Sequence, residues 1–141
     1  MREVFMPVIT QAKKWLGTPY HHQGRILGVG VDCATLLCEV YHAAGLIPYI
    51  DPTPYPPDWH LHRGEERYLD WVTQYADQIE TPQAGDVVLY RFGRCVSHAG
   101  IVVEWPMMIH AYMGQGCVLA DGTQGKLANR LAGFWRLRSA S

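Results

Sequence analysis

The chain has 141 residues, of which 48% are hydrophobic and 18% are charged, and its formal net charge is -1. A chain of this length buries roughly two-thirds of its unfolded surface around one core, so we expect a single domain over residues 1–141. A net charge so close to zero provides no electrostatic basis for binding DNA, RNA or an anionic membrane, which excludes nucleic acid as an expected partner.

The sequence contains no candidate for a membrane span. No apolar run reaches the roughly 18 residues that such a helix needs. The first residues, MREVFMPVITQAKKWLG, also lack the apolar core and the cleavage site of a secretory signal, so synthesis in the cytoplasm is expected. Four cysteines without a secretory signal are too few and too irregularly spaced for a disulfide framework, and we therefore expect free thiols.

Apolar residues at helical spacing predict three helices. The first covers residues 3–16. The second begins after Asp32, a good N-cap residue, and ends at Gly45, a typical stop signal. The proline-rich stretch 47–59 is predicted to be an extended surface connector, because proline blocks helix interiors and central strands. Residues 64–80 return to helical spacing and predict the third helix.

The second half of the chain changes to short β-prone runs separated by Gly, Pro, Asp and Asn. The runs are GDVVLY (85–90), AGIVVEW (99–105), MMIHAY (107–112), CVLA (117–120) and GFWRLR (133–138). This pattern predicts an antiparallel meander. Helices followed by strands imply an α+β fold in which the helices pack on one side of the sheet.

Cys33 occupies a position where a thiol can become reactive. It is the first residue of the second predicted helix, directly after the N-cap Asp32. Unpaired backbone N–H groups and the helix dipole favour negative charge there, which lowers the pKa of a thiol. Such a thiolate is a nucleophile when a base and an oxyanion donor can reach it. A small buried side chain explains Cys33 equally well, because free cysteine is often buried.

Two histidines of the predicted meander are candidates for the base. His98 opens the strand HAGIVVEW, and His110 interrupts the apolar run MMIHAY. If these strands pair as a hairpin through EWPMM, both imidazoles lie on one face, where one can act on Cys33 while the other fixes its tautomer. Tyr20, in the loop before the second helix, can donate to an oxyanion. A place in the core is the alternative explanation for His110 and for Tyr20.

A structural zinc site is the alternative from another class of protein. Cys95 and His98 have the spacing C-x2-H, and His110 and Cys117 follow at strand distances. The second half of this set lacks a short paired spacing, and Cys33 would have no role in it. We therefore favour thiol chemistry, for which no metal and no cofactor are expected.

Three segments, read in order, carry a family resemblance. WLGTPYHHQGRILGVGVDCATLL, TPQAGDVVLYRFGRCVSHAGIVVEW and MMIHAY together resemble the NlpC/P60 family of papain-like cysteine peptidases, most of all its phage-type branch. The resemblance covers nearly the whole chain. It implies a papain-like NlpC/P60 fold, with N-terminal helices packed on an antiparallel sheet of about five to six strands.

The resemblance also implies roles for individual residues. Cys33 matches the family's nucleophile, His98 matches its base, and His110 matches the third polar residue, which orients the base. Tyr20 matches the tyrosine that helps to hold the oxyanion. A thiolate–imidazolium pair of Cys33 and His98 would then attack a carbonyl and form an acyl-enzyme that water releases.

The reaction implied by the resemblance is hydrolysis of the peptide stems of bacterial peptidoglycan, commonly between D-glutamate and diaminopimelate. Three residues next to the catalytic positions are expected to bind the substrate: Asp32, Thr35 and Ser97. Thr35 belongs to an Ala-Thr pair where family members often have Ser-Gly or Leu-Gly, so it is expected to alter the groove beside Cys33. Acyl transfer to a nucleophile other than water would use the same residues.

The phage-type resemblance, together with the missing secretory signal, predicts delivery to the cell wall in a virion or tail-like particle. The expected partners are then stem peptides and the proteins of such a particle. The remaining alternative is a non-catalytic component of the particle that keeps the fold and binds peptidoglycan or neighbouring subunits.

Overall fold

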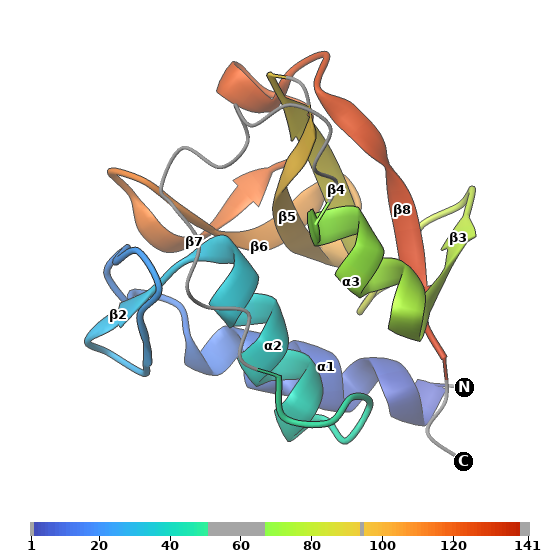
Figure 1. Cartoon of the computed structure of the whole chain (residues 1–141), viewed down its shortest axis with the longest axis horizontal. Helices are drawn as coiled ribbons and strands as arrows, with labels where there is room; N and C mark the ends of the chain where they lie inside the picture. The colour runs from blue at the N-terminus through green and yellow to red at the C-terminus, as the bar shows by residue number, and fades with distance from the viewer. Residues whose placement is uncertain (1, 51–66, 94, 139–141) are drawn as a thin grey trace.

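A computed structural model describes residues 2–50, 67–93 and 95–138 (Figure 1). Its helices are α1 (Arg2–Lys14), α2 (Cys33–Ala43), α3 (Arg67–Tyr75) and the 3₁₀ turn η2 (Gly125–Leu127). The strands β1 (Arg25–Ile26) and β2 (Gly30–Val31) form a small hairpin. The main sheet contains β3 (Ala76–Ile79), β4 (Val87–Phe92), β5 (Cys95–Glu104), β6 (Met107–Tyr112), β7 (Gly116–Asp121) and β8 (Leu131–Leu137).

The main sheet has six strands in the order β3-β8-β4-β5-β6-β7, and all its pairs are antiparallel. The predicted α+β fold is confirmed, and so is the meander from β4 to β7. The last strand differs from a simple meander, because β8 returns to the other side of β4 and pairs with β3. Of the helices that the structure describes, none combines the length and the apolar character that crossing a membrane requires.

The third predicted helix is shorter than its sequence pattern indicates. α3 ends at Tyr75, and residues 76–79 form β3, which pairs with β8. The side chain of Arg138 stabilises the early helix end, since it donates to the carbonyl oxygen of Gln74 at 2.8 Å. The prediction that the helix continues to residue 80 is therefore wrong. Residues 64–66, and residues 51–59 of the predicted proline-rich connector, lie outside the described part of the chain.

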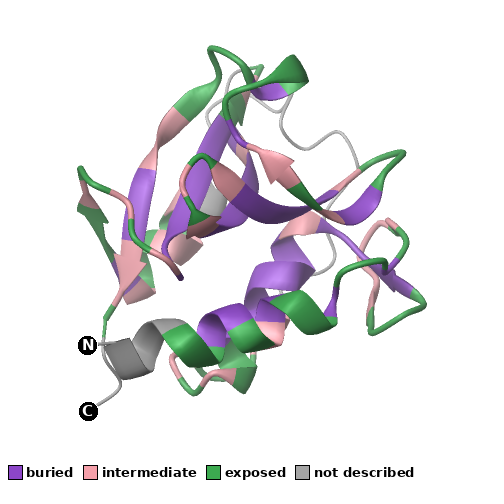
Figure 2. Ribbon diagram, turned by 180° about the vertical axis from the view of Figure 1, so that it is seen from behind, coloured by how far each residue is buried: buried purple, intermediate pink, exposed green. Residues whose placement is uncertain are grey.

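The sheet is buried on both faces at its centre (Figure 2). Val87 and Leu89 of β4 belong to the main hydrophobic core, which contains residues of the helices. Val88 and Tyr90 belong to a second cluster on the opposite face, which Leu127 of η2 helps to cover. A strand buried on both faces has a continuous apolar sequence, which explains the run from Val87 to Tyr90.

The loop that carries Tyr20 is attached to the sheet by backbone hydrogen bonds. Gly17 N–H donates to the carbonyl of Cys117 at 2.9 Å, and Cys117 N–H donates to the carbonyl of Thr18 at 2.8 Å. The neighbouring Gly116 has a φ of +82°, and a Cβ atom there would lie 2.8 Å from the carbonyl oxygen of Thr18. The close approach of this loop to β7 therefore requires glycine at position 116.

We expect Gly116→Ala to lower the free energy of unfolding by about 2 kcal/mol or more, because the methyl group adds a clash to the strain of a positive φ. Gly114→Ala is the matched control, since Gly114 has a φ of +87° and no atom lies within 4 Å of the place that its methyl group would take. Urea unfolding followed by tryptophan fluorescence measures both variants. Equal losses in the two variants would contradict a tight contact between the Tyr20 loop and β7.

Candidate active site

The first turn of α2 is closed by a capping box. Asp32 has extended backbone geometry, and its Oδ1 accepts a hydrogen bond from the Thr35 N–H at 2.9 Å. In return, the Thr35 hydroxyl accepts from the Asp32 N–H at 3.0 Å. The predicted N-cap is thereby confirmed. Cys33 follows it as the first helical residue, in the turn whose N–H groups have no partner within the helix.

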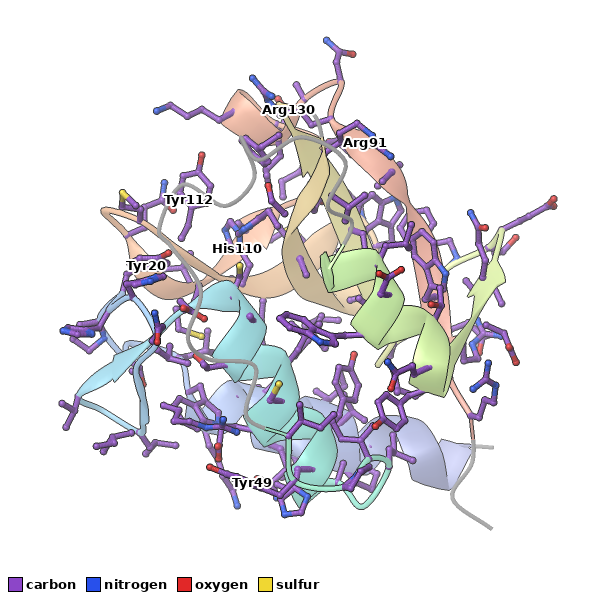
Figure 3. All side chains as sticks on the ribbon, viewed as in Figure 1. Tyr20, Tyr49, Arg91, His110, Tyr112 and Arg130 are labelled. Carbon is purple, nitrogen blue, oxygen red and sulfur yellow. The ribbon has the colours of Figure 1, made fainter. Side chains whose placement is uncertain are left out.

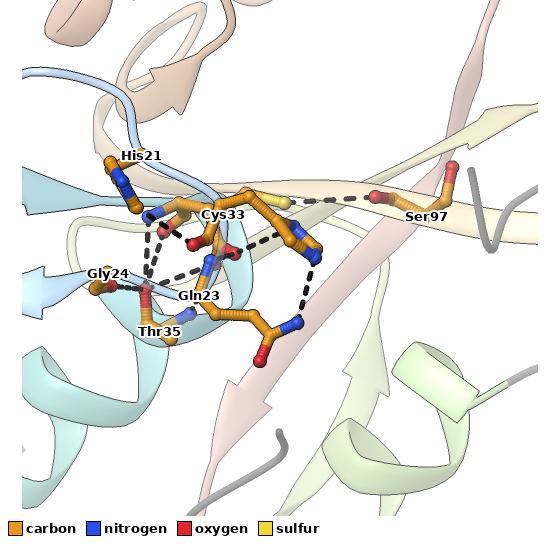
Figure 4. A network of polar contacts seen from close by, with 8 residues as sticks. His21, Gln23, Gly24, Cys33, Thr35 and Ser97 are labelled. Carbon is orange, nitrogen blue, oxygen red and sulfur yellow. Dashed lines mark hydrogen bonds and ion pairs between the residues drawn. The ribbon is translucent and has the colours of Figure 1, made fainter. Parts of the chain in front are cut away.

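The same two residues connect the helix to the loop in front of it (Figure 4). Oδ2 of Asp32 accepts from the Gln23 N–H at 2.7 Å, and the Thr35 hydroxyl donates to the Gly24 carbonyl at 2.5 Å. Only 2% of Asp32 and none of Thr35 is exposed. Both side chains are buried and their polar atoms are used in the capping network, so substrate binding by Asp32 and Thr35 stays a prediction.

Cys33 is partly exposed, and its thiol lies next to the strand that carries His98. Its Sγ is 3.8 Å from the carbonyl oxygen of Ser97, the residue directly before His98 (Figure 4). Ser97 sits in a β-bulge, because Tyr90 pairs with His98 while Arg91 pairs with Val96, which leaves Ser97 without an opposing residue in β4. The Ser97 side chain is partly exposed, and its role in substrate binding stays a prediction.

His98 and His110 form a buried pair. The hairpin of β5 and β6 brings Nε2 of His98 to 2.8 Å from Nδ1 of His110, and the exposed fractions of the two residues are 7% and 3%. Three aromatic rings surround His98, with centroid distances of 5.9 Å to Tyr90, 5.9 Å to Phe92 and 5.3 Å to Tyr112. The prediction that the two imidazoles lie on one face is confirmed, and the aromatic rings limit the movement of His98.

Burial determines the charge of this pair. It lowers the pKa of both imidazoles, and the neighbouring His110 lowers the pKa of His98 further. Both rings are therefore neutral at pH 7. A neutral pair has one proton between Nε2 of His98 and Nδ1 of His110, so one ring donates to the other.

Tyr20 lies beside the start of α2, on the same side of the molecule as His110 and Tyr112 (Figure 3). It is half-buried and forms an isolated bridge with Val31, just before Asp32. Burial raises the pKa of its phenol, and negative charge at Cys33 and Asp32 raises this pKa further. The hydroxyl therefore stays protonated and can donate a hydrogen bond throughout the physiological pH range.

The geometry of these residues argues against a structural zinc site. The nitrogen atoms that face each other in His98 and His110 are hydrogen-bonded, so their lone pairs are not directed at a common metal. Burial raises the pKa of the Cys117 thiol to about 12, whereas a zinc ligand must be deprotonated. The side chain of Cys95 lies outside the description. Among the described residues, no group of three or more His, Cys, Asp or Glu side chains is arranged to hold a metal.

Sequence reasoning missed several parts of this site. Tyr112 was detectable, since it lies two residues after His110 in one strand and so shares its face. The sequence contains no comparable signal for the bulge at Ser97 or for the bonds from Asp32 and Thr35 to the loop. Each of these features depends on residues that are distant in the sequence.

Comparison with known proteins agrees with this architecture. The sequence matches the family model described as NlpC/P60 family over residues 17–136. A search of curated proteins finds no match. Among solved structures, a protein similar to lipoprotein of the NLP/P60 family from Staphylococcus aureus has a TM-score of 0.68 and 23% sequence identity, over 97% of this chain and 42% of that chain. This chain thus spans less than half of that protein.

Two further similar structures come from Mycobacterium tuberculosis. The peptidoglycan hydrolase RipB has a TM-score of 0.58 and 20% identity, over 97% of this chain and 65% of that chain. RipD, described as a non-catalytic NlpC/p60 domain protein adapted to peptidoglycan binding, has a TM-score of 0.60 and 15% identity, over 96% of each chain. Sequence identities this low show a shared fold and no more. The activity has to be inferred from the residues of the site.

The buried histidines predict how stability depends on pH. In the unfolded chain a histidine binds a proton with a pKa of about 6.5, whereas the lowered pKa values keep His98 and His110 unprotonated in the fold. The unfolded state therefore binds more protons as the pH falls, and the free energy of unfolding should decrease below about pH 6.5, by up to about 1.4 kcal/mol per pH unit for each histidine.

Urea unfolding between about pH 7.5 and about pH 5.5 tests this dependence. His110→Asn should show a smaller pH slope than the wild type, because it removes one of the two buried histidines. A wild-type stability that is constant or rises over this range would show that the pair is not buried in its neutral form.

Proposed function

Because this chain belongs to the NlpC/P60 family, we propose that it is a cysteine peptidase that hydrolyses the peptide stems of peptidoglycan. One observation carries the proposal: the thiol of Cys33, at a capped helix start, lies 3.8 Å from the carbonyl directly before His98. His98 in turn is hydrogen-bonded to His110. These contacts support the roles that we propose for Cys33 as the nucleophile, His98 as the base and His110 as the group that orients the base.

The reaction begins with proton transfer from Cys33 to His98. Nε2 of His98 is bound to His110, so Nδ1 is the nitrogen that accepts the proton. Since burial keeps His98 neutral in the resting site, the proton moves as the sulfur attacks the carbonyl carbon, and no preformed thiolate–imidazolium pair is needed. The protonated His98 then donates to the leaving amine, and an acyl-enzyme on Cys33 remains.

Two donors are available for the oxyanion of the tetrahedral intermediate. The backbone N–H of Cys33 belongs to the first turn of α2, and the protonated hydroxyl of Tyr20 lies beside it. Water, activated by His98, then attacks the acyl-enzyme and releases the second product. His110 orients His98 through their hydrogen bond and takes no part in bond breaking.

On the resemblance of the sequence motifs, we also propose that the cleaved bond joins D-glutamate to diaminopimelate. We propose on the same basis that a virion or tail-like particle delivers the protein to the cell wall. A non-catalytic binding role is the competing function, and the likeness to RipD is the observation that favours it. The combination of Cys33, His98, His110 and Tyr20 at one site favours the enzyme.

Removal of the nucleophile should abolish turnover. We expect Cys33→Ala to lower the rate of stem-peptide cleavage by at least about 10³-fold, because no other group can form the acyl-enzyme. Cys38→Ala is the matched control, since it removes a second thiol from the same helix. Mass spectrometry of purified peptidoglycan stem peptides incubated with each protein measures cleavage, and the fragment masses identify the bond. Fragments formed equally by Cys33→Ala would refute the proposed function.

Removal of the Tyr20 hydroxyl should slow the chemical step. We expect Tyr20→Phe to lower kcat by about 10²-fold and to leave KM nearly unchanged, because the hydroxyl binds only the oxyanion of the intermediate. Tyr49→Phe, at an exposed position, is the control and should keep full activity. Steady-state kinetics on a purified stem peptide separates the two parameters. A raised KM with an unchanged kcat would instead place Tyr20 in ground-state binding.

A further inference from the structure

One buried polar atom near the candidate site lacks a hydrogen-bond partner among the described residues. Nδ1 of His110 is bound to His98, but in the described part of the chain Nε2 of His110 is unpaired. His110 is only 3% exposed, so bulk water does not solvate its ring freely. Buried polar atoms are nearly always hydrogen-bonded, and an unpaired one indicates that a ligand or an ordered water belongs there.

A cavity of about 580 Å³ borders this ring. It lies between the turn that joins β6 to β7 and the η2 region, and its lining includes His110, Tyr112, Asp121 and Lys126. The two nitrogens of an imidazole point in nearly opposite directions, so Nε2 of His110 is directed away from His98. Figure 3 shows His110 and Tyr112 together on this side of the molecule. The cavity is large enough for a group the size of an amino-acid residue.

The group that meets Nε2 of His110 decides which tautomer the histidine pair adopts. If Nε2 of His110 carries a proton, Nδ1 of His110 must accept, and His98 then donates from its own Nε2. Nδ1 of His98 is then unprotonated, as a base for Cys33 must be. In the opposite arrangement Nδ1 of His98 carries the proton and cannot act as a base. A hydrogen-bond acceptor in the cavity therefore selects the arrangement that is competent for catalysis.

The charges around the cavity indicate the kind of acceptor. Among the lining residues that the structure describes, Lys126 carries the positive charge and Asp121 the negative charge. Oδ1 of Asp121 already accepts from the backbone N–H and the hydroxyl of Thr123, at 2.9 and 2.6 Å. We propose that this cavity binds a carboxylate group, one oxygen of which accepts a hydrogen bond from Nε2 of His110 while Lys126 supplies the opposite charge.

This binding site deepens the proposed function. The role of the ligand in preparing His98 rests on that function, because only a peptidase needs the base at Nδ1 of His98. Binding of the carboxylate does not depend on turnover. A carboxylate ligand in this cavity would prepare the catalytic base at His98.

Nuclear magnetic resonance of the folded Cys33→Ala protein, labelled with ¹⁵N at histidine, tests the proposal. N-acetylglycine is the carboxylate probe, and N-acetylglycinamide is its neutral counterpart of nearly equal size. With pH and ionic strength constant, N-acetylglycine should bind with a Kd of about 1–10 mM. It should shift the Nε2 resonance of His110 to that of a protonated donor and that of His98 Nδ1 to an unprotonated nitrogen, while the amide should bind at least about ten-fold more weakly.

Substitutions at the two lining charges should act in opposite directions. Lys126→Ala should raise the Kd of N-acetylglycine by about two- to five-fold, as expected for an exposed charge, and Asp121→Asn should lower it by a similar factor. Lys13→Ala, which changes an exposed lysine of α1, should leave the Kd unchanged. The unlabelled wild type can be assayed in parallel for stem-peptide cleavage.

Three results would overturn the inference: no shift at His110 with either probe, equal binding of acid and amide, or no effect of Lys126→Ala. The outcome is separable from that of the proposed function. Carboxylate binding at His110 without cleavage by the wild type would leave the site intact and reject the peptidase. Cleavage without any response of His110 would reject this site alone.

Discussion

The buried carboxylate of Asp32 is the interaction on which the rest of the site depends. One oxygen caps α2 through Thr35, and the other accepts from the backbone of Gln23. Thr35 adds a bond from its hydroxyl to Gly24. Because these bonds join a helix start to the loop in front of it, they place Cys33 and Tyr20 side by side. A carboxylate buried in this way is tolerated because its oxygens are hydrogen-bonded to nearby donors.

The second constraint is the burial of two imidazoles in contact. Placing polar rings among Tyr90, Phe92 and Tyr112 costs free energy, which the bond between His98 and His110 offsets in part. The result is a histidine pair with one fixed orientation, since neither ring can turn without breaking that bond or displacing an aromatic neighbour. The same burial keeps both rings neutral, which is the form in which a histidine accepts a proton.

The bulge at Ser97 joins parts of the molecule that a regular strand would keep apart. Cys33 packs against the main core on the helix side of the sheet, whereas His98 is paired with Tyr90, a member of the cluster on the opposite face. One extra residue bends β5 and turns the Ser97 carbonyl to the thiol. Both the peptidoglycan hydrolase RipB and the non-catalytic protein RipD have a fold similar to this one. The residues around the bulge, more than the fold, therefore decide the chemistry.

The sequence by itself determined the elements whose signals are local. The cap at Asp32, the place of Cys33 at the helix start and the shared face of His98 and His110 follow from neighbouring residues and a two-strand hairpin. Tertiary structure decided what depends on distant partners. The strand at residues 76–79 exists because β8 pairs with it, and Thr35 faces inward because Gly24 and Asp32 bind its hydroxyl. Periodicity reports which face of an element is apolar, but the partner that covers this face comes from a remote part of the chain.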